Sequence, residues 1–239
     1  KNIDSKIDKK LFRIIFHNAN KLGLVSLGSF LILKGNTLIA SKYLSLDIVA
    51  QYGLSLQLFT ILSSISTTLL TVFIPKIVQN RIKENGEEIK EIYSMCFVLN
   101  IFIFISGVIS IVYVAPYFIS ILGSNTKLLD RNKMLFMGGY LLLEMIHSNA
   151  ATFITTRNRV PFVSSSILSG VAMVLISLFL INFTDLGLWS LLISQAVIQL
   201  LYNNWKWPLE VNKELKINFF GLWKTGIKKI IKILKGEKI

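Results

Sequence analysis

The sequence lacks most of the features from which a soluble enzyme is built. Cys96 is its only cysteine and lies in an apolar run, so it can form neither an internal disulfide nor a cysteine metal site. There is no Walker loop, no His–Glu zinc motif and no Gly-rich dinucleotide turn. These absences argue against ATP-driven transport within this chain and against a nucleotide-sugar transferase. We therefore predict a protein that is not an enzyme and that carries no cofactor and no metal.

Charge is also scarce. Only 16% of the 239 residues are charged, while 53% are apolar, whereas soluble domains are about 25% charged. The mean hydropathy is +0.60. The net charge of +13 could indicate nucleic acid, but the positive residues flank apolar runs. This placement indicates that the Lys and Arg residues lie on the inner side of a membrane, and that their partner is anionic lipid rather than nucleic acid.

Six apolar stretches occupy most of the chain. Each is close to the roughly 20 residues that a helix needs to cross a bilayer. We therefore predict an all-α polytopic membrane protein, a bundle of six transmembrane helices. The expected spans are 22–41, 48–74, 93–121, 134–155, 162–183 and 188–202, with Pro75 ending the second and Pro116 kinking the third.

The two ends of the chain are basic and amphipathic. Residues 1–21 alternate Ile and Leu with Lys and Arg at helical spacing, which predicts an interfacial segment before a six-helix lobe at 22–207. Residues 208–239 form a tail whose helical stretch, 219–235, carries apolar and Lys residues on different faces. We expect this tail to lie on the anionic cytoplasmic leaflet, with a calmodulin-like target as the alternative.

The distribution of Lys and Arg predicts the orientation. If both termini are cytoplasmic, the opposite side carries only Lys42, Lys127, Arg131 and Lys133. Both termini are therefore expected inside. The chain begins at Lys1 rather than Met, so we also expect it to be the later part of a longer protein.

Polar residues recur on single faces of the expected spans. For Ser and Thr, close helix packing is one explanation. Asn, Gln, Lys and Glu are costly in lipid, so we expect them to face a wet lumen or one another. The candidate lumen residues that could bind substrate are Lys34, Gln57, Asn100, Glu144, His147, Asn149, Gln195 and Gln199.

Three sets of candidate residues have competing interpretations. Lys34 lies near the middle of its span, where it could hold an anionic ligand or pair with Glu144. Glu144 and His147 share a face of span 134–155 and could relay a proton, bind a cation or simply pair. Arg157 and Arg159 lie at the expected cytoplasmic mouth, where they are either ordinary positive-inside residues or capture phosphate groups before substrate passes inward.

Residues 43–76 resemble a known family. Tyr43-Leu44-Ser45-Leu46-Asp47-Ile48-Val49-Ala50-Gln51-Tyr52-Gly53-Leu54 is followed by Gln57, a Ser/Thr-rich helix and Ile74-Pro75-Lys76. This pattern resembles the polysaccharide flippases of the multidrug/oligosaccharidyl-lipid/polysaccharide exporter superfamily. The charged segment 76–92, the turn at 157–159 and the stretch 186–189 are also similar, so the resemblance covers about residues 45–210.

The resemblance implies an exporter of two six-helix lobes around a lumen, of which this chain would be the C-terminal lobe. It implies a bacterial inner-membrane protein that moves undecaprenyl-pyrophosphate-linked oligosaccharide, such as an O-antigen unit for lipopolysaccharide, to the outer leaflet. Lys34 matches the role of a lumen cation that holds pyrophosphate. The missing N-terminal lobe would be a partner. Two alternatives stay open: a cation-coupled multidrug exporter that uses Glu144, and a transport-inactive lobe that only assembles with a partner.

Overall fold

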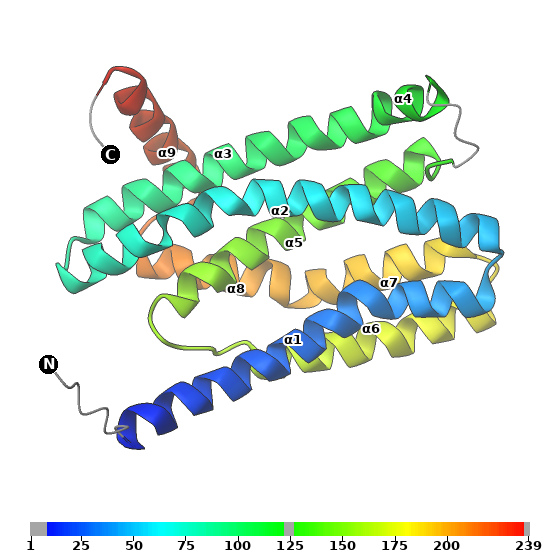
Figure 1. The fold of residues 1–239 in the computed structure, drawn as a ribbon, viewed down its shortest axis with the longest axis horizontal. Helices are drawn as coiled ribbons and strands as arrows, with labels where there is room; N and C mark the ends of the chain where they lie inside the picture. Colours follow the sequence, from blue (N-terminus) through cyan, green and yellow to red (C-terminus); the bar gives the residue numbers. More distant parts are fainter. Residues whose placement is uncertain (1–8, 122–126, 237–239) are drawn as a thin grey trace, which may run out of the picture.

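Every regular element in the described part of the chain is a helix, which confirms the all-α prediction. The computed structural model describes residues 9–121 and 127–236. Their helices run roughly along one direction, except for α4 and α9 (Figure 1). They are α1 (Lys9–Tyr43), α2 (Leu46–Ile82), α3 (Gly86–Tyr113), α4 (Ala115–Ile121), α5 (Arg131–Thr155), α6 (Val163–Phe183), α7 (Leu188–Leu201), α8 (Asn203–Glu214) and α9 (Phe219–Leu234).

Four helices of the described chain are long and apolar enough to cross a membrane. They are Ile15–Tyr43 within α1, Leu46–Ile82, Gly86–Tyr113 and Val163–Phe183. Many of their large apolar side chains face outward, as Phe102 and Leu168 do. An outer surface of this kind is stable against hydrocarbon and costly against water. The protein is therefore a helical membrane protein.

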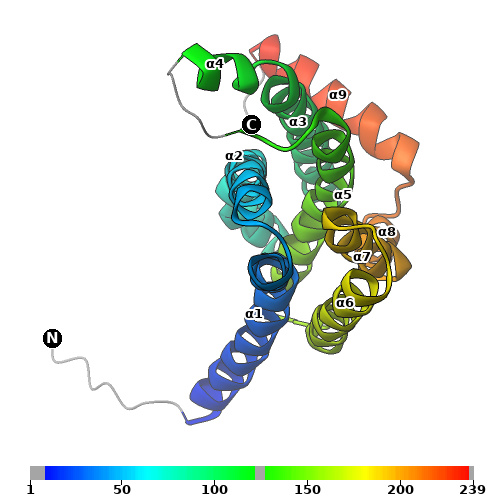
Figure 2. The same cartoon turned by 90° about the vertical axis from the view of Figure 1, so that its right-hand side faces the viewer.

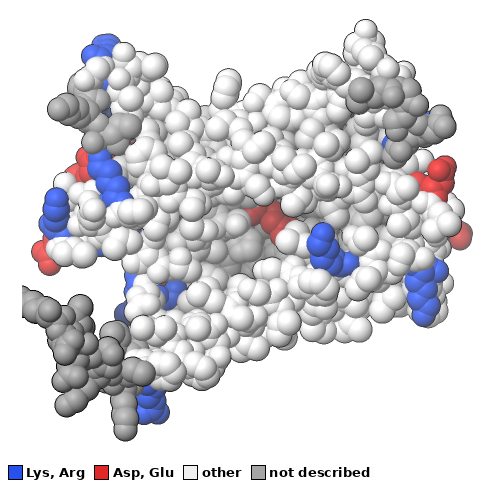
Figure 3. All heavy atoms as spheres, in the orientation of Figure 1, with Lys and Arg blue, Asp and Glu red and all other residues white. Residues whose placement is uncertain are grey.

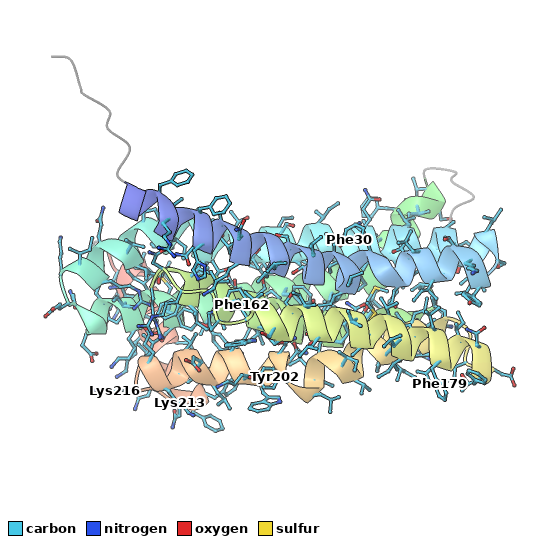
Figure 4. All side chains as sticks on the ribbon, turned by 90° about the horizontal axis from the view of Figure 1, so that it is seen from below. Phe30, Phe162, Phe179, Tyr202, Lys213 and Lys216 are labelled. Atoms are coloured by element: carbon cyan, nitrogen blue, oxygen red, sulfur yellow. The ribbon has the colours of Figure 1, made fainter. Side chains whose placement is uncertain are left out.

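The two other expected spans differ from these four. Stretch 134–155 lies in α5, which is less apolar because Glu144, His147 and Asn149 interrupt it. Stretch 188–202 forms α7, which ends at Leu201 after 14 residues. The chain breaks at Tyr202, where φ is −145° and ψ is −59°, and continues as α8. Figure 4 labels Tyr202 at this join, and Figure 1 shows that α7 and α8 lie nearly end to end.

Polar residues in the loops begin several helices, as N-cap chemistry predicts. The side chain of Asn85 accepts a hydrogen bond from the Glu88 amide at 3.2 Å, at the start of α3. Asn218 accepts one from the Gly221 amide at 2.7 Å and begins α9. These caps satisfy amides that the first helical turn leaves without partners.

The expected end of the second span at Pro75 was placed wrongly. α2 continues through Pro75 to Ile82, because its last turns are held by packing, with Ile77 and Asn80 buried. That burial outweighs the cost of a proline inside a helix. The expected interfacial segment 1–21 lies partly outside the described residues, and from Lys9 onward it continues without a break into the first span as α1. Pro116 does follow a break: α3 ends at Tyr113 and α4 begins at Ala115.

The helices pack as two groups joined through α5. In the first group α2 packs on α3, and α5 contacts both; in the second, α1 packs along α6 and α6 along α7. Figure 2, which views the long helices nearly end on, shows these groups on either side of α5. The α1–α6 contact depends on glycine: a Cβ at Gly28 would lie 2.6 Å from the Ser166 carbonyl oxygen, and one at Gly170 would lie 2.8 Å from the Gly28 carbonyl oxygen.

Buried hydrogen bonds connect the second group. The Asn36 side chain on α1 donates to the Leu191 carbonyl at 2.9 Å and to the Gln195 side chain at 3.3 Å, both on α7. Its own oxygen accepts a bond from Ser177 on α6 at 2.9 Å. Helices in lipid lose the hydrophobic effect as a driving force, so such bonds and close packing hold them together.

Candidate functional site: a hydroxyl-lined cavity between α1, α2, α5 and α6

A cavity of about 560 Å³ lies where the two helix groups face each other. Its walls come from α1, α2, α5 and α6, and Asn203 at the start of α8 also contributes. Apolar residues such as Leu56, Leu141 and Phe162 form part of the wall. Figure 3 shows a hollow in the middle of one face with acidic atoms inside it and a basic side chain at its edge. The volume is in the range of sites that bind small molecules.

Hydroxyl groups are the commonest polar groups in the cavity wall. They are carried by Ser29, Thr60, Ser63, Ser64, Thr67, Ser148, Thr152, Thr155, Ser165 and Ser166. Thr60, Ser63, Ser64 and Thr67 recur every three or four residues, so α2 turns one hydroxyl face to the cavity.

The hydroxyls of α2 are held as acceptors. Thr60 donates to the Leu56 carbonyl at 2.8 Å, Ser64 to the Thr60 carbonyl at 3.0 Å and Thr67 to the Ser63 carbonyl at 2.9 Å. A hydroxyl has one proton and two lone pairs, so each of these groups can still accept a hydrogen bond. The wall is therefore suited to a ligand rich in hydroxyl donors.

Glu144 and His147 are the two titratable residues that line the cavity within the described chain. They lie one turn apart on α5. The Oε2 atom of Glu144 and the Nδ1 atom of His147 are both buried without a hydrogen-bond partner. Buried polar groups normally have partners, so both atoms are available to a ligand or an ion that enters.

Two predicted lumen residues lie outside the cavity wall. Lys34 is exposed nine residues before the end of α1, next to Leu33, which does line the cavity. Gln57 is exposed on α2, next to the lining residue Leu56. Each lies about 100° around its helix from that neighbour. The expected alternative pair between Lys34 and Glu144 is not among the ion pairs of the described residues.

Four predicted lumen residues are buried between helices and do not line the cavity themselves. Gln195 accepts the bond from Asn36 described above, and Gln199 accepts one from Asn203 at 3.0 Å. Asn149 donates to the sulfur of Met145 at 3.1 Å. Asn100 is buried in α3, and neither of its amide atoms has a partner.

The two arginines of the 157–159 turn differ. Arg157 forms an ion pair with Glu214 at the end of α8. Arg81 at the end of α2 pairs with the same carboxylate, with its Nη1 atom 2.6 Å from Oε1. Arg159 is exposed. The carboxylate of Glu214 therefore already neutralises Arg157, and Arg159 is the more accessible cation of the turn.

Asn203 was missed in the sequence. Its amide donates to the Ser169 hydroxyl on α6 at 2.8 Å, and its oxygen accepts a bond from the Trp207 ring nitrogen at 3.1 Å. It thus lines the cavity and fixes the α7–α8 join against α6. The helical break that places it there has no proline or glycine to signal it.

The described residues contain no group of three or more His, Cys, Asp or Glu side chains that could hold a metal ion. Glu144 and His147 alone supply two of the ligands that such a site needs. The cavity is thus better suited to hydrogen bonding than to metal chemistry. Comparison with known proteins adds no relative: no family model, no curated protein and no solved structure matches this chain.

Proposed function

We propose that this chain is one six-helix lobe of a membrane exporter and takes part in flipping an undecaprenyl-pyrophosphate-linked oligosaccharide across the bacterial inner membrane. The observation that carries the proposal is the hydroxyl-lined cavity between apolar helices. Sugars present many hydroxyl donors, and the α2 hydroxyls keep lone pairs free to accept them. The resemblance of residues 43–76 to polysaccharide flippases supplies the substrate class.

In this proposal α5 and the jointed pair α7–α8 complete the six crossings. An even number of crossings returns the chain to the side on which it started. In keeping with this, the start of α1 and helix α9 lie at the same end of the bundle (Figure 1). The excess of Lys and Arg outside the spans assigns that end to the cytoplasm.

Lys34 is the residue proposed to hold the pyrophosphate. It is exposed beside the cavity wall, about 13.5 Å along α1 from the end of the helix at Tyr43, where a cation is costly unless it has an anionic partner or water. Arg159, being exposed, is the proposed first contact at the cytoplasmic mouth. Arg157 is assigned a structural role, because Glu214 already pairs with it.

The test is complementation of a host strain in which the gene for the full protein is deleted. Deletion should abolish surface glycan and the wild-type gene should restore it. Lys34→Ala should restore less than about a tenth of the wild-type amount, since a lost charge contact costs about 1.5–3 kcal/mol. Lys34→Arg should restore most of it. The matched control is Lys42→Ala, which removes an exposed cation at the end of the same helix. Full recovery with Lys34→Ala would remove Lys34 from the mechanism.

A second candidate function is cation-coupled export of drugs. It is favoured by the unpaired Glu144 and His147 atoms inside the cavity. Drug resistance that is lost in Glu144→Gln while surface glycan is unchanged would select this function. Glu210→Gln is the control, since Glu210 lies on α8 and pairs with Lys206 at 3.3 Å. If deletion changes neither glycan nor drug resistance, the lobe is a transport-inactive assembly partner.

A further inference from the structure

Helix α9 has three distinct faces. One face, formed by Leu222, Gly226 and Lys229, is buried. The next is apolar and exposed, with Phe220 and Leu234 each 81% exposed and Ile227 and Ile231 beside them. At 100° per residue, Lys224, Lys228, Lys232 and Lys235 share a third, exposed face. Lys232 is at the same time 3.9 Å from the Glu91 carboxylate of α3, while its side chain stays 49% exposed. With its buried face packed against the protein, α9 therefore still exposes one apolar surface and one basic surface.

The buried face fixes α9 against α3. A Cβ at Gly226 would lie 2.3 Å from the Ser94 carbonyl oxygen, so the two helix backbones touch at this glycine. The ammonium group of Lys229 donates to Glu91 at 2.8 Å and to Glu88 at 3.2 Å. Figure 2 shows that α9 lies across the outside of α3. Figure 1 shows that the axis of α9 is strongly inclined to the axes of the long helices.

The contacts along α3 set the rotation of α9. Nearest the start of α3, Glu88 and Glu91 meet Lys229; further in, Phe97 stacks edge-on with Phe219 and Trp223 at 5.8 and 6.1 Å. From residue 88 to residue 97 is about 13 Å along a helix, which is close to the width of α9 itself. The charged side of α9 is thus directed toward the first turns of α3, and its aromatic side toward the middle of that membrane helix.

We infer that α9 lies in the surface of the membrane, with its exposed apolar face in the acyl chains and its row of four lysines on the phosphates of anionic lipids. The order of groups across α9 matches the order across a leaflet, from charge through aromatic rings to hydrocarbon. The partner must be negative, because the exposed row carries only lysine and the chain as a whole is +13. An acidic protein would satisfy the lysines but would leave Phe220 and Leu234 without an apolar surface at this depth.

A depth measurement tests the location. Nitroxide labels are placed at Ile231→Cys and, separately, at Lys228→Cys in the full chain; Cys96 is buried, and the unmodified chain is the blank. In vesicles of three parts phosphatidylcholine to one part phosphatidylglycerol, the label at 231 should be relaxed by oxygen and the label at 228 by a water-soluble nickel complex. Nickel access at both positions in these vesicles would overturn the inference. Nickel access at both that is lost only on addition of host cytosol would assign the face to an acidic protein instead.

A charge-matched pair of variants tests the lysine row. Each lysine near an anionic surface is worth about a fivefold change in affinity. Lys224→Gln combined with Lys228→Gln should weaken binding of titrated phosphatidylglycerol about 25-fold, measured by native mass spectrometry. Lys213→Gln combined with Lys216→Gln removes the same charge from exposed residues outside the row (Figure 4) and should change it less than about twofold. Equal losses in both variants would show diffuse attraction and overturn the assignment to α9.

Discussion

Arg81 and Glu214 form an ion pair, with 2.6 Å between Nη1 and Oε1, that joins the end of α2 to the end of α8. The two residues are 133 positions apart in the sequence. Arg157 binds the second oxygen of the same carboxylate. Thr156 accepts a further bond from Arg81 Nε at 2.7 Å. The carboxylate of Glu214 therefore joins α2, α8 and the segment after α5 at this end of the bundle.

Glu214→Gln should lower the stability of the bundle. The substitution leaves two arginines facing each other without their shared anion, and losing a bond to a charged group costs about 1.5–3 kcal/mol. The apparent melting temperature of the protein in detergent, followed by tryptophan fluorescence, should fall by several degrees. Glu210→Gln removes a partly exposed i,i+4 pair with Lys206 on the same helix and should cost under about 0.5 kcal/mol. Equal melting temperatures for the two variants would contradict the prediction.

Gly28→Ala should loosen the contact between α1 and α6. The new Cβ would lie 2.4 Å from the Ser166 hydroxyl oxygen and 2.6 Å from the Ser166 carbonyl oxygen, so a backbone must move. Overpacking of this kind costs about 1–3 kcal/mol. Gly23→Ala on the same helix is the control, since its Cβ meets nothing within 4 Å and alanine favours the helix by about 0.5–1 kcal/mol. Thermal unfolding should rank Gly23→Ala at or above the wild type and Gly28→Ala clearly below it.

Asp130 makes the start of α5 sensitive to acid. Partial burial alone would raise the pKa of Asp130, but hydrogen bonds from the side chain and the backbone amide of Lys133 outweigh it and lower the pKa below its usual 3.8. A lowered folded-state pKa gives stability that is present above 3.8 and is lost as the pH falls through the folded value.

Melting temperatures at pH 7 and pH 3 check this point. Asp130→Asn keeps an N-cap acceptor without the charge, so its melting temperature should change less between the two pH values than that of the wild type. Asp130→Ala should be less stable at both, by about 1 kcal/mol, because the cap itself is lost. A wild type and an Asn variant with the same pH response would show that the ionised carboxylate contributes nothing.

Filling the cavity should block transport. Ser63 lines the cavity on α2, so Ser63→Trp places an indole in the space proposed for substrate. Ser106→Trp adds the same ring to an exposed position of α3, where lipid can accommodate it. We expect export, measured as surface glycan in the complemented deletion strain, to fall at least about tenfold with Ser63→Trp and to stay near wild type with Ser106→Trp. Equal export by both variants at equal protein levels would show that substrate does not pass through the cavity.

Much of the fold could be predicted from the sequence. Apolar length identified the four helices that are long and apolar enough to cross a membrane. The predicted helix end at Pro75 was wrong because helix propensity describes only the local backbone. The burial of Ile77, which keeps α2 helical, depends on residues that are distant in the sequence. No proline or glycine marks the break at Tyr202, so the apolar pattern did not predict that the helix would be interrupted there.

The candidate site was harder to predict than the fold. In a membrane protein a polar face can contact either a cavity or another helix, and the spacing of the residues is the same in both cases. Glu144 and His147 line the cavity, while Gln195 and Gln199 bond to neighbouring helices. Only the packing of the helices separates the cavity residues from the inter-helix residues. That packing depends on glycine contacts between α1 and α6 and on hydrogen bonds from Asn36 to α7, all between residues far apart in the sequence.

Helix α8 has a mechanical consequence. Asn203 at its first residue belongs to the cavity wall, and Glu214 at its last residue holds Arg81 and Arg157. Eleven helical steps, about 16.5 Å, separate the two residues. A short helix is stiff, so α8 holds its two ends at a fixed distance. Helix α8 is therefore a rigid strut that connects the wall of the cavity with the ion pairs at the end of the bundle.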